Sequence, residues 1–206
     1  MSQQAKVIDV SRHRMGTDGH TDGHGIVTLI VLAGCPLSCK YCINDFCHTS
    51  EGEIITVDEL LEFISLDDIY FKMSGGGITF GGGEPLLQSD FIKCVAEKMD
   101  SKWKLNIETS LYVPWEKIKL IIDVVDKWYV DVKDLSDTIY RDYTGKSVTL
   151  LRKNLDRLYD AVDHDKIVLR VPDIPNYNTE MNIENTLRYL SKYDCEIDRF
   201  IYEIKK

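Results

Sequence analysis

The sequence predicts an α/β protein built as a partial, open barrel of six β/α units. Short runs rich in β-branched residues alternate with amphipathic segments of helical length, and each strand precedes its helix. This alternation is typical of parallel sheets with right-handed crossovers. A closed eight-fold barrel typically needs about 250 residues, whereas this chain has 206. We therefore expect a single domain over residues 1–206, with 1–24 as an N-terminal extension or loop.

The expected elements follow from hydrophobic periodicity. The strands are expected at residues 26–32, 78–80, 104–109, 128–133, 167–171 and 200–204. The helices are expected at residues 56–64, 91–99, 114–125, 150–162 and 183–193. Thr56 and Glu59 form a capping-box pattern, and Pro114 suits a first helical position. The doublet at residues 17–24, Thr-Asp-Gly-His repeated twice, predicts a flexible loop.

The composition excludes several classes of function. A net charge of −9 does not provide the basic field that binding to a phosphate backbone needs, so no nucleic-acid partner is expected. No apolar stretch approaches the roughly 20 residues that cross a bilayer, and no secretion signal opens the sequence. We therefore expect no membrane association and a cytoplasmic location. In that reducing compartment, clustered cysteines indicate metal or redox ligands rather than disulfides.

Three of the six cysteines are clustered as Cys35-x₃-Cys39-x₂-Cys42, directly after the first expected strand. Soft thiolates select iron–sulfur clusters, zinc or copper(I). Three ligands on a four-iron cluster leave one iron open. Cys47 could instead supply a fourth ligand and close the site as a structural zinc or an electron-transfer centre. The spacing alone leaves both interpretations open.

A second candidate region lies at the end of the next expected strand. Two glycine triplets, at residues 75–77 and 81–83, flank Ile78-Thr79-Phe80, and Glu84 follows them. Residues without a Cβ allow a ligand to approach the backbone closely, and Glu84 would add a carboxylate at the same rim. A phosphate-binding loop is the competing interpretation, but no Lys-Ser/Thr pair follows these glycines.

The combination of these motifs resembles the radical S-adenosylmethionine (SAM) superfamily. The resemblance rests on the cysteine motif with Tyr41 before its third cysteine, and on Gly82-Gly83-Glu84 after the second strand. More narrowly, the chain resembles the glycyl radical enzyme activating enzymes of the pyruvate formate-lyase type. That likeness continues through residues 74–79, 108–110, 131–133, 143–145 and 170–175. It implies the partial barrel of the radical SAM type.

The resemblance implies a mechanism and a set of catalytic residues. Cys35, Cys39 and Cys42 would bind a [4Fe–4S] cluster, and SAM would chelate the iron that has no cysteine. One electron would then cleave SAM to a 5′-deoxyadenosyl radical, which abstracts hydrogen from a glycine of a partner glycyl radical enzyme. Lys133 would neutralise a carboxylate. The implied electron donor is a flavodoxin or ferredoxin, and a monomer is expected.

Further residues are assigned to the cofactors by the same resemblance. Gly82 and Gly83 would accept the methionyl ammonium, and Tyr41 with Ile43 would hold the adenine. The remaining SAM contacts are expected from Glu84, Thr109, Asp131, Val132 and Lys133. A monovalent cation is expected at Glu108, Thr109 and Asp131. Because Asp131 and Lys133 are two apart on an expected strand, both should face the barrel interior. The alternative for Glu108, Asp131 and Lys133 is an interior ion-pair network.

Some features depart from the family, and other functions stay open. The expected Gly-Pro-Gly-x-Arg segment reads Asp22-Gly23-His24-Gly25-Ile26 here, and the histidine expected after the last strand is absent. About thirty residues separate Cys42 from Gly75. This is too few for the ferredoxin-like insert that some activating enzymes carry, so the resemblance implies a single cluster. The alternatives are a radical enzyme acting on another peptide or small molecule, an activator of anaerobic ribonucleotide reductase, and a non-enzymatic Cys₄ metal or electron-transfer module.

Overall fold

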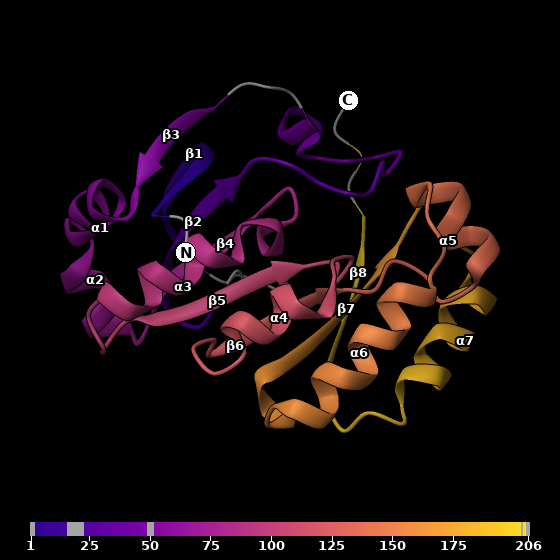
Figure 1. Ribbon diagram of the computed structural model, residues 1–206. Coiled ribbons are helices and arrows are strands. Elements are labelled where there is room, and N and C mark those ends of the chain that lie inside the picture. Colours follow the sequence, from indigo (N-terminus) through magenta and orange to yellow (C-terminus); the bar gives the residue numbers. More distant parts are fainter. Residues whose placement is uncertain (1–2, 16–22, 49–51, 203, 205–206) are drawn as a thin grey trace.

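The computed structural model describes residues 3–15, 23–48, 52–202 and 204. One sheet has the strand order β3-β1-β2-β4-β5-β6-β7-β8 (Figure 1). Its strands are β1 (Gln4–Met15), β2 (Ile26–Leu32), β3 (Glu53–Thr56), β4 (Gly77–Gly82), β5 (Lys104–Thr109), β6 (Lys127–Asp131), β7 (Ile167–Asp173) and β8 (Glu196–Ile201). Within the described residues, β2 and β4 to β8 form six parallel strands. The predicted open barrel of six parallel strands is confirmed.

Seven helices and three short 3₁₀ turns connect the strands in the described part of the chain. The helices are α1 (Val57–Ser65), α2 (Asp68–Ser74), α3 (Ser89–Lys98), α4 (Trp115–Ile121), α5 (Asp137–Thr144), α6 (Thr149–Ala161) and α7 (Glu180–Leu190). The 3₁₀ turns are η1 (Asp45–His48), η2 (Pro85–Gln88) and η3 (His164–Lys166). At the start of α1, the Thr56 hydroxyl accepts a hydrogen bond from the Glu59 N–H, and the Glu59 carboxylate accepts one from the Thr56 N–H. These are the two hydrogen bonds of a capping box. The predicted capping box is therefore confirmed.

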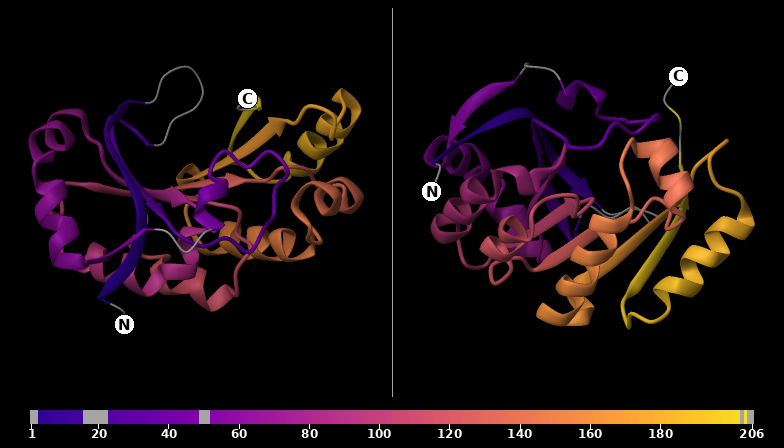
Figure 2. Two further views of the ribbon diagram at one scale, coloured as in Figure 1. Left: turned by 90° about the horizontal axis from the view of Figure 1, so that it is seen from above. Right: turned by 45° about the vertical axis from the view of Figure 1, so that its right-hand side comes forward.

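The two faces of the sheet differ in character. Alternate strand residues such as Ile30, Phe80 and Val130 are fully buried in the main apolar core between the sheet and the helices. Side chains alternate along a strand, so the residues next to these point to the other face. There, polar residues such as Glu108 and Asp131 line the barrel interior. Seen from above, β1 lies in one half of the molecule and β8 in the other, in agreement with the strand order (Figure 2). The face that carries the polar residues is therefore the one that lines the pocket, and the other face packs in the main core.

The expectation that residues 1–24 form an extension or loop is wrong for their described part. Residues 4–15 form β1, which pairs antiparallel with β2 and with β3. The polar residues along β1 concealed this strand, because it lies near the edge of the sheet and is partly exposed. Most of the predicted loop at residues 17–24 lies outside the described residues. The sequence also did not predict β3, α2 or α5.

A buried carboxylate ties β1 to the region between α1 and α2. Asp67 is fully buried and accepts hydrogen bonds from the Arg12 guanidinium, with 2.9 Å between Nε and Oδ2. Its other partners are the Thr28 hydroxyl at 2.7 Å and His13 Nε2 at 2.8 Å. Burial acts to raise the pKa of Asp67, but the hydrogen bonds from Arg12 and Thr28 hold it below its ordinary value.

Other boundaries shift by a few residues from the expected ones. The strand at residues 104–109 is confirmed with its predicted bounds. Pro114 is the N-cap of α4 rather than its first residue, and β6 ends at Asp131 rather than at Lys133. Among the described residues, none of the helices combines the length and apolar character that crossing a bilayer requires.

Candidate active site

Three cysteines from one loop line a pocket at the C-terminal ends of the parallel strands. The segment of residues 35–42, here called the cysteine loop, runs from the end of β2 towards η1. The pocket is lined by Cys35, Leu37, Cys39, Cys42, Ile43, Asn44, Gly82, Gly83, Glu108, Thr109, Ser110, Asp131, Lys133, Tyr143, Arg170, Phe200 and Tyr202. The structure thus brings together the two motifs that lie forty residues apart in the sequence.

The thiols occupy a setting that suits a positively charged group. Burial raises the pKa of Cys35 to about 12. Burial also raises the pKa of Cys39, and the nearby Lys133 ammonium opposes that effect only in part. A coordinated metal deprotonates a thiol outright, because its charge outweighs the cost of burying a thiolate. Three thiols beside an open pocket therefore fit a soft-metal cluster that is held by three cysteines.

Cys47 lies outside this group of thiols. It is 1% exposed and packs with Leu29 and Val31 in a small apolar cluster. Its backbone N–H donates to the Asn44 carbonyl, and its own carbonyl accepts from Gly34. Because its side chain does not line the pocket, the geometry favours three cysteine ligands over the closed arrangement with four.

Gly82 and Gly83 bring bare backbone to the pocket wall. Gly82 has a φ of +97°, a conformation that side-chain-bearing residues rarely adopt. A Cβ on Gly83 would lie 2.1 Å from the Gly34 carbonyl oxygen. The close packing of the two loops therefore requires glycine at position 83. Without side chains, the two glycines expose their main chain to the pocket. Main-chain carbonyl oxygens are the acceptors that the ammonium group of a ligand would need.

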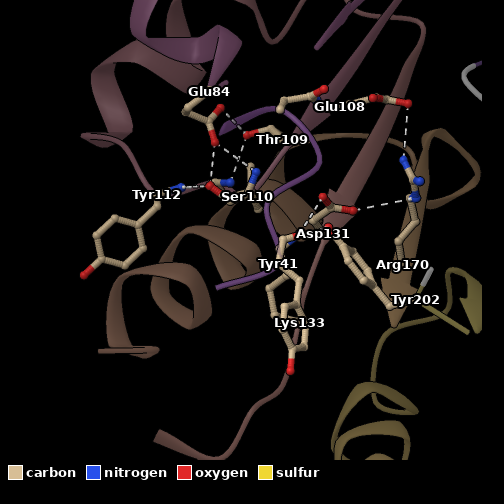
Figure 3. A network of polar contacts seen from close by, with 12 residues as sticks. Tyr41, Glu84, Glu108, Thr109, Ser110, Tyr112, Asp131, Lys133, Arg170 and Tyr202 are labelled. Carbon is tan, nitrogen blue, oxygen red and sulfur yellow. Dashed lines mark hydrogen bonds and ion pairs between the residues drawn. The ribbon is translucent and has the colours of Figure 1, made fainter. Parts of the chain in front are cut away.

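Glu84 does not stand at the rim, as was expected, but is fully buried behind it. Its carboxylate accepts hydrogen bonds from the Thr109 hydroxyl at 2.6 Å, and from the Ser110 hydroxyl and N–H at 2.6 Å and 2.9 Å (Figure 3). Burial raises its pKa, and these hydrogen bonds oppose that effect. Glu84 therefore connects the end of β4 to the end of β5, and its side chain does not line the pocket.

A network of alternating charges crosses the pocket. Lys133 Nζ lies 2.9 Å from Asp131 Oδ2, and Arg170 Nη1 lies 3.2 Å from Glu108 Oε1. Arg170 Nε also lies 3.6 Å from Asp131 Oδ1. Burial would raise the pKa of Asp131, but Lys133 and Arg170 outweigh it and the pKa lies below its ordinary value. Asp131 attracts Lys133 strongly enough to raise the lysine pKa despite burial.

This network modifies two expectations. Asp131 and Lys133 do not share a strand face by alternation, because β6 ends at Asp131 and Lys133 has a φ of +64°. The turn nevertheless returns Lys133 to the pocket. The three residues expected to bind a cation are already engaged, since Glu108 and Asp131 face Arg170 and the Thr109 hydroxyl donates to Glu84. The three residues line the same pocket, but in the structure their side-chain oxygens contact protein groups, and the cation site stays a prediction.

Two more expected cofactor residues have side chains outside the pocket lining. Val132 is fully buried in the main core, on the helix side of the sheet. The Tyr41 ring packs edge-on against Tyr143 and Tyr177, and its hydroxyl accepts from Asn176 Nδ2 at 3.2 Å. Ile43, in contrast, lines the pocket.

Sequence reasoning assigned no role to Ser110, Arg170, Phe200 or Tyr202, all of which line the pocket. Ser110 and Arg170 lie within the segments that carry the family resemblance. Phe200 lies in β8 and Tyr202 directly follows that strand. The two residues are two apart in the strand expected at residues 200–204, and this alternation was the available signal that both face the interior.

Comparisons with known proteins agree with this geometry. Residues 29–190 match the family model described as the radical SAM superfamily. The chain is 38% identical to the (2S)-3-sulfopropanediol dehydratase activating enzyme of Klebsiella oxytoca, over 68% of this chain and 44% of the relative. It is 33% identical to the pyruvate formate-lyase-activating enzyme of Clostridium pasteurianum, over 74% of this chain and 63% of that relative.

A solved structure extends the likeness in fold. SuiB of Streptococcus suis, solved with its precursor peptide SuiA, superposes with a TM-score of 0.65 at 14% identity, covering 87% of this chain and 41% of that one. At that identity the likeness concerns the fold alone. The chain spans less than two thirds of the length of the two curated relatives named above.

Proposed function

This chain belongs to the radical SAM superfamily, and we propose that it is an activating enzyme that abstracts hydrogen from a glycine of a partner glycyl radical enzyme. Membership of the superfamily implies a [4Fe–4S] cluster and SAM as cofactors. One observation carries the proposal: three thiols of one loop share a pocket with bare glycine backbone and a Lys133–Asp131 pair. The relatives that are named activating enzymes support the choice of reaction.

The residues of this chain would divide the binding work between them. Cys35, Cys39 and Cys42 would hold three irons of the cluster, since their thiols line the same wall. The carbonyls of Gly82 and Gly83 would accept the ammonium of SAM, and Lys133 would face its carboxylate. Ile43 would contact the adenine. Ile43, which is exposed, and Lys133, which is mostly buried, would thus contact different parts of the nucleoside.

The cofactors supply chemistry that no side chain offers: a low-potential electron and a carbon radical able to take hydrogen from a glycine Cα. The protein's contribution is to orient the reacting groups and to limit the access of water. Asp131 could accept a hydrogen bond from a ribose hydroxyl, because its pKa keeps it ionised and acceptor-only near neutral pH. The negative charge of Asp131 is balanced by the mostly buried side chains of Lys133 and Arg170.

The wider assignments belong to the same proposal. The partner would be a glycyl radical enzyme, and the electron donor a flavodoxin or ferredoxin. We further propose a single domain over residues 1–206, a monomer, and a cytoplasmic location, because free cysteines and an acidic surface suit a reducing compartment.

Anaerobic reconstitution followed by reduction with SAM tests the proposed reaction. We expect about four irons per chain and the formation of 5′-deoxyadenosine. Cys42→Ser should abolish that product, whereas Cys195→Ser, remote from the pocket, should keep it. Cys47→Ser should also keep the cluster and the cleavage of SAM. Loss of metal in Cys47→Ser would instead support the closed four-cysteine module.

A second assay addresses the partner. The reduced protein would be mixed with a glycyl radical enzyme encoded by a neighbouring reading frame, and the mixture followed by electron paramagnetic resonance. A glycyl radical signal that requires SAM supports the activating reaction. Production of 5′-deoxyadenosine without such a signal would favour a radical enzyme for another peptide or small molecule, or the reductase activator.

A further inference from the structure

Tyr202 reaches across the open side of the barrel to the cysteine loop. Its backbone N–H donates to the Asp173 carbonyl at 2.9 Å, which fixes it beside the end of β7. Its hydroxyl donates a hydrogen bond to the Tyr41 carbonyl at 2.5 Å. The two residues are 161 positions apart in the sequence. The Tyr202 side chain also lines the pocket, and Figure 3 shows it beside Tyr41 and Lys133.

The bond from Tyr202 restrains one peptide unit between two cysteines. The Tyr41 carbonyl belongs to the same planar peptide as the Cys42 N–H. That N–H donates to the Cys39 carbonyl at 3.2 Å. The Tyr41–Cys42 peptide is therefore held at both ends, by Tyr202 and by Cys39. Because a planar peptide rotates as a unit, these two bonds set the direction in which the Cys42 side chain leaves the backbone.

The other contacts of the cysteine loop hold different parts of it. The Ser38 and Lys40 N–H groups donate to the Thr144 and Tyr143 carbonyls at 2.9 Å and 3.0 Å, so the end of α5 holds the middle of the loop. None of these bonds restrains the carbonyl of the Tyr41–Cys42 peptide, which accepts the Tyr202 hydroxyl.

We propose that Tyr202 is a positioning residue that sets the orientation of the Cys42 thiolate, and through it the geometry of the cluster and of the SAM site. The inference rests on the three-cysteine cluster of the proposed function but not on the identity of the partner. A ligand held by second-layer hydrogen bonds keeps its orientation, and loss of such a bond typically costs about 10- to 100-fold in affinity or activity.

The test compares Tyr202→Phe with Tyr177→Phe in the reconstituted protein. Tyr202→Phe keeps the ring and removes only the hydroxyl. Tyr177 is the matched control, because it packs in the same aromatic group around Tyr41 through its ring edge. The measurements are iron content, circular dichroism, the resonance spectrum of the reduced cluster before SAM is added, and the KM for SAM in 5′-deoxyadenosine formation.

We expect Tyr202→Phe to keep the wild-type circular dichroism, to shift or broaden the cluster signal, and to raise the KM for SAM at least threefold. Tyr177→Phe should match the wild type in every measurement. A Tyr202→Phe protein that matches the wild type overturns the proposal, as does an equal change in both variants or global unfolding of Tyr202→Phe. Failure of the wild type itself to form 5′-deoxyadenosine would instead overturn the proposed function.

Discussion

Arg170 on β7 donates a hydrogen bond to Glu108 on β5, with 3.2 Å between Nη1 and Oε1. The two strands are separated by β6, so the contact crosses the concave interior rather than joining neighbours. Arg170 Nε also lies 3.6 Å from Asp131 Oδ1. One guanidinium therefore neutralises both carboxylates that a monovalent cation was expected to bind.

Removing that guanidinium should make SAM binding depend on an added cation. In Arg170→Gln, Glu108 and Asp131 would lose a mostly buried positive neighbour. We expect the KM for SAM to rise about tenfold, which corresponds to about 1.4 kcal/mol, and potassium chloride to restore part of the loss. Tetramethylammonium chloride at equal ionic strength is the control, because that ion is too large to replace a small cation between the carboxylates. Equal responses to the two salts would contradict this account.

Gly83→Ala should damage the pocket more than the fold. The new Cβ would meet the Gly34 carbonyl oxygen at 2.1 Å, so the two loops must separate beside the cysteine loop. We expect the affinity for SAM, measured by equilibrium binding, to fall at least tenfold. Gly75→Ala is the matched control, because a Cβ there meets nothing closer than 3.7 Å. With its φ of +74° it should lose about 1 kcal/mol of stability and keep its SAM affinity.

Arg12→Met should weaken the attachment of β1. The change leaves the fully buried Asp67 carboxylate without its guanidinium partner. Removing one partner of a buried carboxylate is destabilising because the remaining charge is left without compensation, and the partial exposure of Arg12 moderates this loss. The free energy of unfolding in urea measures this loss. Arg141→Met is the control, because its pair with Asp137 is exposed, and its loss should be clearly smaller than that of Arg12→Met.

The effect of Arg12 should diminish in acid. The pKa of Asp67 is lowered in the folded protein, so its ionised form contributes stability above the unfolded pKa near 3.9. That contribution is lost as the pH falls through the lowered folded pKa. Wild type and Arg12→Met should therefore differ most near neutral pH, begin to converge below about pH 4, and meet only below the lowered pKa of Asp67. A difference that stays constant over this range would contradict the assignment to Asp67.

The fold was predictable where hydrophobic periodicity was strong. Residues 26–32 and 104–109 were both predicted with their observed bounds, because each is a run of strand length with clear limits. Residues 4–15 escaped prediction because Lys6, Asp9 and Arg12 interrupt any apolar pattern. Such a strand becomes visible only when β2 is there to pair with it, which is a tertiary interaction that local sequence does not encode.

The sequence predicted that three thiols lie together, and it predicted less about the residues that surround them. The spacing of Cys35, Cys39 and Cys42 already indicated a shared metal. Glu84 was expected at the rim, but its partners Thr109 and Ser110 lie 25 and 26 residues away, and only the folded chain reveals them. The roles of Arg170 and Tyr202 likewise depend on contacts between strands that are distant in sequence.

Spectroscopy of the oxygen-free, reduced protein during titration with SAM tests the central claim most directly. An iron left without a cysteine ligand should bind the nucleoside, so the resonance signal of a [4Fe–4S]⁺ cluster should change with SAM and saturate at one equivalent per chain. A tetrahedral zinc, or an iron–sulfur signal that SAM leaves unchanged, would contradict the claim.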